Sequence, residues 1–145
     1  MNSGPSSPKR PAEQERIRVV IADDHAQVLD YIERLLKFHF YVVGRAGNGR
    51  ELVDAVAKLL PAVVTTDITM PEMNGIEACR RITSKHGGPK VVVLSVHNDP
   101  VIVQAAFQAG ASAYVWKPFI DSDLIPAIKN VLAGQRYCSS GLRET

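Results

Sequence analysis

The chain of 145 residues lacks most marks of a secreted, membrane-spanning or zinc-binding protein. Its two cysteines, Cys79 and Cys138, stand far apart and form no Cys-x-x-Cys or zinc-type spacing. No apolar run approaches the roughly 20 residues that span a bilayer, and residues 1–8 lack the apolar core of a secretory signal. These absences argue against a disulfide framework or a membrane span and predict a cytoplasmic protein with reduced thiols.

Excess positive charge is also missing from most of the chain. The sequence has 17 basic and 15 acidic residues; residues 1–18 hold four of the basic and two of the acidic ones, which leaves 13 of each in the remainder. A domain that grips nucleic acid by itself usually shows a basic excess or stripe. We therefore expect no nucleic-acid binding by this chain alone.

The remaining composition is that of a globular domain, with 46% hydrophobic and 22% charged residues. The length suits one domain with a real core. Residues 1–15 are rich in Pro, Ser and charge without apolar periodicity, so we predict a disordered leader there. We expect the folded domain over residues 16–134 and a C-terminal tail over residues 135–145.

Short β-branched runs alternate with amphipathic stretches five times within the expected domain. Strands are predicted at residues 17–22, 40–43, 62–67, 90–95 and 112–116. Apolar residues at helical spacing mark a helix after each strand. This alternation predicts an α/β fold, a three-layer doubly wound (βα)5 sandwich with a parallel sheet and right-handed crossovers.

Polar side chains follow four of the predicted strands. Asp23 and Asp24 come after the first, Asp67 after the third, Ser95 after the fourth and Lys117 after the fifth. All strands of a parallel sheet end at the same edge, where open α/β folds bind ligands. We therefore expect three carboxylates, a hydroxyl and an ammonium group to lie together.

Such a cluster suits a metal ion and a phosphoryl group. Neighbouring carboxylates repel one another unless they are protonated or neutralised by a cation. Their hard oxygen atoms favour Mg²⁺ or Ca²⁺, and Mg²⁺ fits better because one or two carboxylates with waters and phosphate oxygens usually hold it. The residues alone leave two hypotheses: an aspartate that becomes phosphorylated, or a metal site that binds a phosphate ester.

The motifs around these residues resemble the bacterial two-component response-regulator receiver domain. They are IADD at residues 21–24, TDITMPEMNG at 66–75, LS at 94–95 and KP at 117–118. The likeness covers roughly residues 16–134 and implies a flavodoxin-like sheet of strand order 2-1-3-4-5. In contrast to the family pattern, Thr65 and Thr66 stand where the third strand is normally aliphatic, a difference that concerns packing rather than chemistry.

The resemblance implies a role for each acid. Asp67 would accept a phosphoryl group from the phosphohistidine of a sensor histidine kinase, or from a small acyl phosphate. Asp24 would bind Mg²⁺ directly and Asp23 through water, together with Asp67 and the backbone carbonyl of Thr69. Lys117 would pair with the phosphoacceptor and then with a phosphoryl oxygen. The domain would thus be a signalling domain rather than an enzyme, although it promotes its own phosphorylation and dephosphorylation.

The resemblance also implies a conformational switch. The Ser95 hydroxyl would bind a phosphoryl oxygen, and Tyr114 would turn inward as Ser95 moves, which remodels the surface of helix 4, strand 5 and helix 5. That surface could carry a homodimer. Thr69 and His97 would modulate how fast water removes the phosphoryl group.

Structural explanations remain open for several of these residues. The acid pair at residues 23–24 could form an ordinary turn and helix cap, Ser95 a strand-end hydroxyl, Tyr114 a core residue and His97 a solvated loop residue. By strand alternation Trp116 shares a face with Tyr114, and its indole could anchor a partner or pack beneath the last helix. His25 is expected in a loop rather than as a metal ligand.

The segments AGASAYVWKPF at residues 109–119 and VLAGQRY at 131–137 resemble receivers of the NarL/FixJ-like class, which are usually joined to a C-terminal helix-turn-helix domain. The tail from Gln135 would then begin an interdomain linker, and no helix-turn-helix pattern follows it. Two outputs stay open: transcription through a domain outside this chain, which we favour, or a single-domain regulator that acts through protein contacts.

Two other classes of function fit less well. An aspartyl-nucleophile phosphatase resembling the haloacid-dehalogenase family needs a second Asp two residues after the first, where this chain has Thr69. A degenerate receiver that only binds partners would lack the acids or the lysine, and all of them are present.

Overall fold

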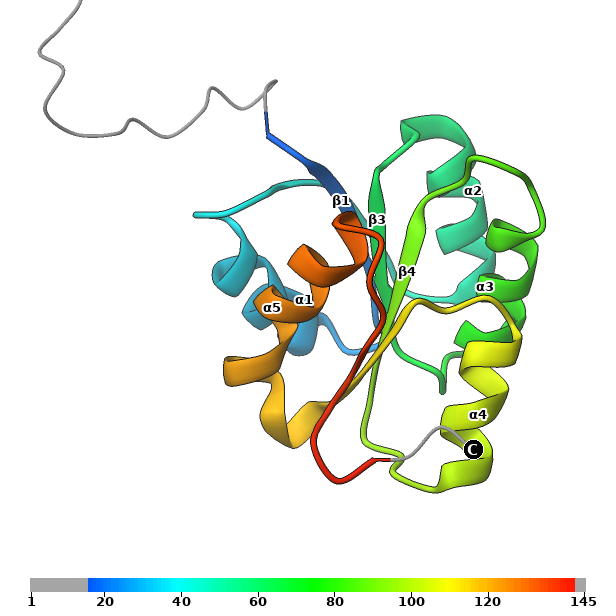
Figure 1. Cartoon of the computed structure of the whole chain (residues 1–145). Coiled ribbons are helices and arrows are strands. Elements are labelled where there is room, and N and C mark those ends of the chain that lie inside the picture. The colour runs from blue at the N-terminus through cyan, green and yellow to red at the C-terminus, as the bar shows by residue number, and fades with distance from the viewer. Residues whose placement is uncertain (1–15, 143–145) are drawn as a thin grey trace, which may run out of the picture.

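The computed structural model describes residues 16–142, so the predicted leader at residues 1–15 lies outside the described part. A single parallel sheet forms the middle layer (Figure 1). It has six strands in the order β2-β1-β3-β4-β5-β6. The strands are β1 (Arg18–Ala22), β2 (Tyr41–Ala46), β3 (Val63–Thr66), β4 (Lys90–Ser95), β5 (Ala113–Trp116) and β6 (Tyr137–Cys138).

Helices cover both faces of this sheet. One face packs against α1 (Ala26–Leu36) and α5 (Ile120–Leu132), and the other against α2 (Gly49–Leu59), α3 (Gly75–Thr83) and α4 (Pro100–Gln108) (Figure 1). The predicted flavodoxin-like, doubly wound fold is therefore confirmed.

Alternation along the strands divides the core in two. In β3, Val63 faces the cluster under α1 and α5, while Val64 faces the cluster under α2, α3 and α4. Both side chains are fully buried. This burial on two faces explains why the strands are continuous β-branched runs instead of alternating apolar and polar residues.

Local sequence sets the start of three helices. Asn48 and Asn74 each accept a hydrogen bond from a backbone N–H three residues on, at 2.9 Å, before α2 and α3. Asp99 caps α4 by accepting a hydrogen bond from the Val101 N–H, two residues on, with Pro100 in the first turn where a missing N–H is harmless. These caps bound the loops that lead away from the carboxyl edge of the sheet.

The second strand is longer than predicted. It continues past Val43 to Ala46, and Gly44 pairs with Val20 of β1. A Cβ at Gly44 would lie 2.6 Å from a terminal carbon of Leu59 in α2. The glycine therefore serves the close approach of strand and helix, whereas the predicted strand ended at residue 43.

The sixth strand is an addition to the predicted order. Ala113 and Tyr114 of β5 pair with Tyr137 and Cys138, which lie in the predicted C-terminal tail. Two residues are too short for a periodic signal, and their pairing depends on the edge that β5 leaves open. Within the described range of 16–142, no helix has the length and apolarity to cross a membrane.

Candidate functional site at the carboxyl edge of the sheet

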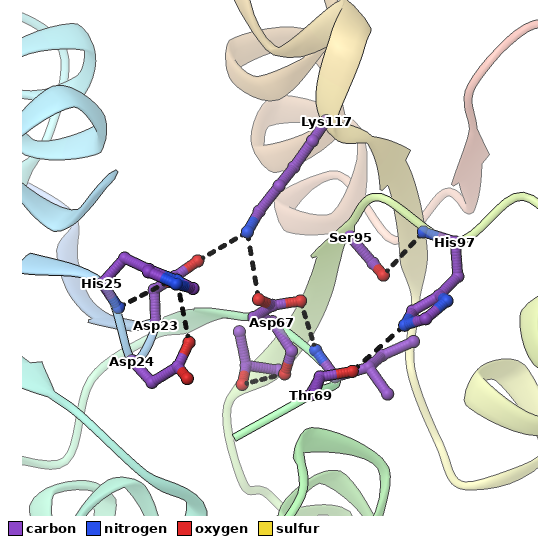
Figure 2. A network of polar contacts seen from close by, with 10 residues as sticks. Asp23, Asp24, His25, Asp67, Thr69, Ser95, His97 and Lys117 are labelled. Carbon is purple, nitrogen blue, oxygen red and sulfur yellow. Dashed lines mark hydrogen bonds and ion pairs between the residues drawn. The ribbon is translucent and has the colours of Figure 1, made fainter. Parts of the chain in front are cut away.

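The fold brings the acids after β1 and β3 together with the lysine after β5 (Figure 2). The Lys117 ammonium donates to Asp23 Oδ2 at 2.8 Å and to Asp67 Oδ2 at 3.0 Å. Asp23 is 1% exposed and Asp67 7% exposed. Burial acts to lower the pKa of Lys117, but the two carboxylates outweigh it and the pKa is raised. One ammonium group is thus shared by two buried carboxylates.

The phosphoacceptor predicted from the sequence is held by its own loop. Asp67 Oδ1 accepts a hydrogen bond from the Ile68 N–H at 2.7 Å. The loop then folds back, with the Gly75 N–H on the Ile68 carbonyl at 2.8 Å. A Cβ at Gly75 would lie 1.8 Å from the Asp67 carbonyl oxygen, closer than any real contact. Gly75 is therefore required by the close return of the chain beneath the aspartate.

His25 contacts both members of the acid pair. Its Nδ1 lies 3.2 Å from Asp23 Oδ1 and 3.0 Å from Asp24 Oδ1, and its backbone N–H donates to Asp23 at 2.9 Å. The sequence pattern predicted only a loop residue here. The only sign of this contact in the sequence is that His25 directly follows the two acids, because the orientation of its ring depends on the turn into α1.

The donor set fits a divalent cation. Asp23, Asp24 and Asp67 bring three negative charges against the single positive charge of Lys117. With His25 neutral, the cluster keeps an excess of two negative charges, and ligand atoms of residues 23, 24 and 25 all lie within 4.8 Å of one another. Carboxylate oxygens suit Mg²⁺. The backbone carbonyl of Thr69 as a further ligand stays a prediction.

His97 lies at the centre of a second hydrogen-bond network, beside the acids (Figure 2). Its backbone N–H donates to Ser95 Oγ at 3.1 Å, and its Nε2 lies 3.1 Å from the Thr69 hydroxyl. Its carbonyl accepts a hydrogen bond from the Tyr114 hydroxyl at 2.8 Å. Ser95, Thr69 and Tyr114, which the resemblance assigned to switching or modulation, therefore all contact one residue.

Tyr114 points into the protein and is fully buried. Burial raises the pKa of its hydroxyl, and a hydrogen bond with Ser95 offsets part of that effect. Two residues on, the Trp116 indole N–H donates to the Val96 carbonyl at 2.9 Å, and its ring meets Phe119 edge-on. The Trp116 side chain thus contacts the loop between β4 and α4 and the 3₁₀ turn before α5, so of the two alternatives for it the structure does not show packing beneath the last helix.

Comparison with known proteins identifies the family. The family model described as "Response regulator receiver domain" matches residues 19–129, so the chain belongs to the response-regulator receiver family.

Two curated relatives illustrate its range. The chain is 42% identical over 121 residues to the transcriptional regulatory protein PdtaR of Mycobacterium tuberculosis, covering 83% of this chain and 58% of PdtaR. It is 39% identical over 115 residues to the chemotaxis protein CheY of Thermotoga maritima, covering 79% of this chain and 96% of CheY. The chain spans about half the length of the transcriptional regulators it matches, 53% and 58% in two cases.

A solved structure indicates the class of receiver to which the chain is similar. A two-component response regulator of the LuxR family from Aurantimonas sp. superposes with a TM-score of 0.81 at 32% identity, covering 87% of this chain and 91% of that one. This similarity confirms the NarL/FixJ-like class predicted from residues 109–119 and 131–137.

Proposed function

We propose that this receiver domain accepts a phosphoryl group on Asp67 from a sensor histidine kinase and passes the signal to an output through its α4–β5–α5 surface. The observation that carries the proposal is the Lys117 ammonium held between Asp23 and Asp67. The negative charge of a nucleophilic carboxylate has to be balanced by a group that does not block its attack. A lysine ammonium at hydrogen-bond distance balances this charge and can also bind the oxygens of the incoming phosphoryl group.

The transfer is a displacement at phosphorus. A carboxylate oxygen of Asp67 attacks, the bond from phosphorus to the kinase histidine nitrogen breaks, and its electron pair returns to the imidazole. Lys117 moves its hydrogen bond from Asp67 to a phosphoryl oxygen and keeps the one to Asp23. The acids at residues 23, 24 and 67 would hold Mg²⁺, which when bound would supply positive charge to offset that of the phosphoryl oxygens.

The same site sets the lifetime of the phosphorylated state. Thr69 and His97 contact each other beside Asp67, so together they limit how a water molecule approaches the acyl phosphate. The Ser95 hydroxyl leaves the His97 backbone N–H to bind a phosphoryl oxygen. That exchange alters the loop to which Tyr114 is bonded, and the change reaches α4 and β5.

Two outputs have support among the relatives. PdtaR, a transcriptional regulator, is longer than this chain and favours control of transcription through a further domain. CheY, which this chain covers almost completely, favours action by protein contacts alone. We favour the first because the transcriptional regulators that this chain matches are longer than it, with 53% and 58% of their length covered in two cases. A homodimer through the α4–β5–α5 surface or another face is compatible with either output.

Intact-protein mass spectrometry tests the proposal. With acetyl phosphate and Mg²⁺ the wild type should gain one phosphoryl group, and chelation of Mg²⁺ should abolish the gain. Asp67→Asn should stay unlabelled, whereas Asp54→Asn, a control at an exposed aspartate of α2, should be labelled like the wild type. Labelling that persists in Asp67→Asn, or no labelling of the wild type, would refute the assignment.

A further inference from the structure

The chain after α5 returns to the sheet and is built into the receiver (Figure 1). The Tyr137 N–H donates to the Ser112 carbonyl at 3.2 Å, and the Ser139 N–H to the Tyr114 carbonyl at 3.0 Å. This segment therefore continues the hydrogen-bonding pattern of the sheet alongside β5, the strand that leads into Lys117.

Ser139 is 1% exposed, and its hydroxyl joins two elements. Ser139 Oγ accepts a hydrogen bond from the Trp116 backbone N–H at 3.0 Å and donates to Asp123 Oδ2 in the first turn of α5 at 2.6 Å. The paired residues of β6 stop opposite Tyr114. The serine hydroxyl thus replaces a strand partner for the last N–H of β5.

The two groups that this hydroxyl joins lie on either side of Lys117. Trp116 directly precedes the lysine, and the short 3₁₀ turn Lys117–Phe119 leads from it into α5 and Asp123. The backbone before and after the lysine is therefore tied to one buried atom. The backbone position of Lys117 sets how its long side chain must extend for the ammonium to hold Asp23 and Asp67 at the same time.

Other contacts hold this segment in place without Ser139. Tyr137 packs against the cluster under α5, while Cys138 and Leu142 pack against the cluster under α4. The Arg136 guanidinium lies over the Phe107 ring of α4, 4.2 Å from its centroid. Removal of the Ser139 hydroxyl should therefore leave the segment docked and change only the tie to Trp116 and Asp123.

We propose that Ser139 is a positioning residue for Lys117, which keeps the lysine ammonium on Asp67 through its hydrogen bonds to Trp116 and Asp123. The inference rests on the proposed function of Asp67 and Lys117. Without the hydroxyl, the Trp116 N–H at the end of β5 loses its partner, and Asp123 keeps only its hydrogen bonds with Ser122 and Tyr137. The turn that carries the lysine therefore loosens.

The direct test is the rate at which Asp67 is phosphorylated by acetyl phosphate. Ser139→Ala should slow this rate about fivefold, the effect of one lost hydrogen bond on a barrier. The Mg²⁺ concentration for half-maximal rate should not change, because the acids are untouched. Ser140→Ala, at the exposed neighbouring serine, is the matched control and should react like the wild type.

A double-mutant cycle separates positioning from general damage. If Ser139 acts through Lys117, then Ser139→Ala should slow the reaction no further in a protein that already has Lys117→Gln. Equal slowing in both backgrounds would overturn the proposal, as would an unchanged rate in the single variant. Asp123→Ala breaks the same tie from its other end and should slow the reaction similarly, which covers the case that Ser139→Ala folds poorly.

A second measurement does not depend on phosphorylation. The ¹⁵N signal of the Lys117 ammonium, assigned with Lys117→Gln, should shift in Ser139→Ala and stay in place in Ser140→Ala. An unshifted signal would refute the positioning role even if the wild type were never labelled. Conversely, a shifted signal with an unlabelled wild type would refute the proposed phosphoryl transfer and leave the positioning role standing.

Discussion

Thr65, in the middle of β3, is expected to lower the stability of this receiver. Its side chain is fully buried, and its hydroxyl is the one buried side-chain polar atom without a hydrogen-bond partner in the described residues 16–142. It pairs with Ile21 of β1 and Val92 of β4, both also fully buried on the face under α1 and α5. An unpaired hydroxyl in such a place costs about 1–3 kcal/mol.

Thr65→Val replaces that hydroxyl by a methyl group of similar shape. We expect the free energy of unfolding to rise by about 1–2 kcal/mol, and the melting temperature by roughly 3–8 °C for a chain of this size. The assay is urea unfolding followed by circular dichroism, with thermal unfolding as a second measure. Asp67 and the other acids are untouched, so phosphorylation should not change.

The neighbouring threonine supplies a control of opposite sign. Thr66 is equally buried, but its hydroxyl donates to the Asp67 carbonyl at 2.8 Å. Thr66→Val should therefore lower the free energy of unfolding by about 1 kcal/mol. If Thr65→Val destabilises the protein, or if the two substitutions act in the same direction, hydrogen-bond satisfaction does not decide stability at these positions.

Three further outcomes follow from the same structure. Gly75→Ala forces a Cβ against backbone and should destabilise the protein by about 3 kcal/mol in urea unfolding, whereas Gly47→Ala, which meets only the end of a flexible side chain at 3.5 Å, should cost under about 1 kcal/mol. Burial raises the pKa of Cys79 to about 12, so a thiol reagent at neutral pH should leave it unmodified in the native protein, while both cysteines react after unfolding; native modification of Cys79 would contradict this. The pKa of Lys117 is raised from 10.5 in the folded state, so its contribution to stability is complete below pH 10.5 and is lost as the pH rises through the folded pKa. Lys117→Met should therefore lose less stability at alkaline pH than the wild type in urea unfolding. An identical alkaline profile of the two proteins would contradict this contribution.

The fold was largely predictable because its signals are local. β3 and β4 are β-branched runs that bury both faces, and they were predicted within one residue of their observed limits. The longer β2 was missed because Gly44 suggests a turn until the approach of Leu59 in α2 is known. β6 was missed because two residues have no periodicity, and only the open edge of β5 gives them a partner.

The candidate site divides in a similar way. Asp23, Asp67, Ser95 and Lys117 were predicted to meet because each follows a strand of one parallel sheet. His25 was not, since its contact with the acids depends on how the chain turns into α1. The proposed roles of all these residues in phosphoryl transfer stay predictions for the experiments above.

The chemical groups at the carboxyl edge could be predicted from local sequence patterns, because these patterns mark the end of each strand. Which of these groups touch depends on the tertiary structure. Lys117 bonds Asp23 and Asp67 across 94 and 50 residues of sequence, and the buried Ser139 hydroxyl joins β5 to α5. Such distances depend on strand order and on the turns between elements, and these are settled by the packing of the whole domain rather than by any short segment.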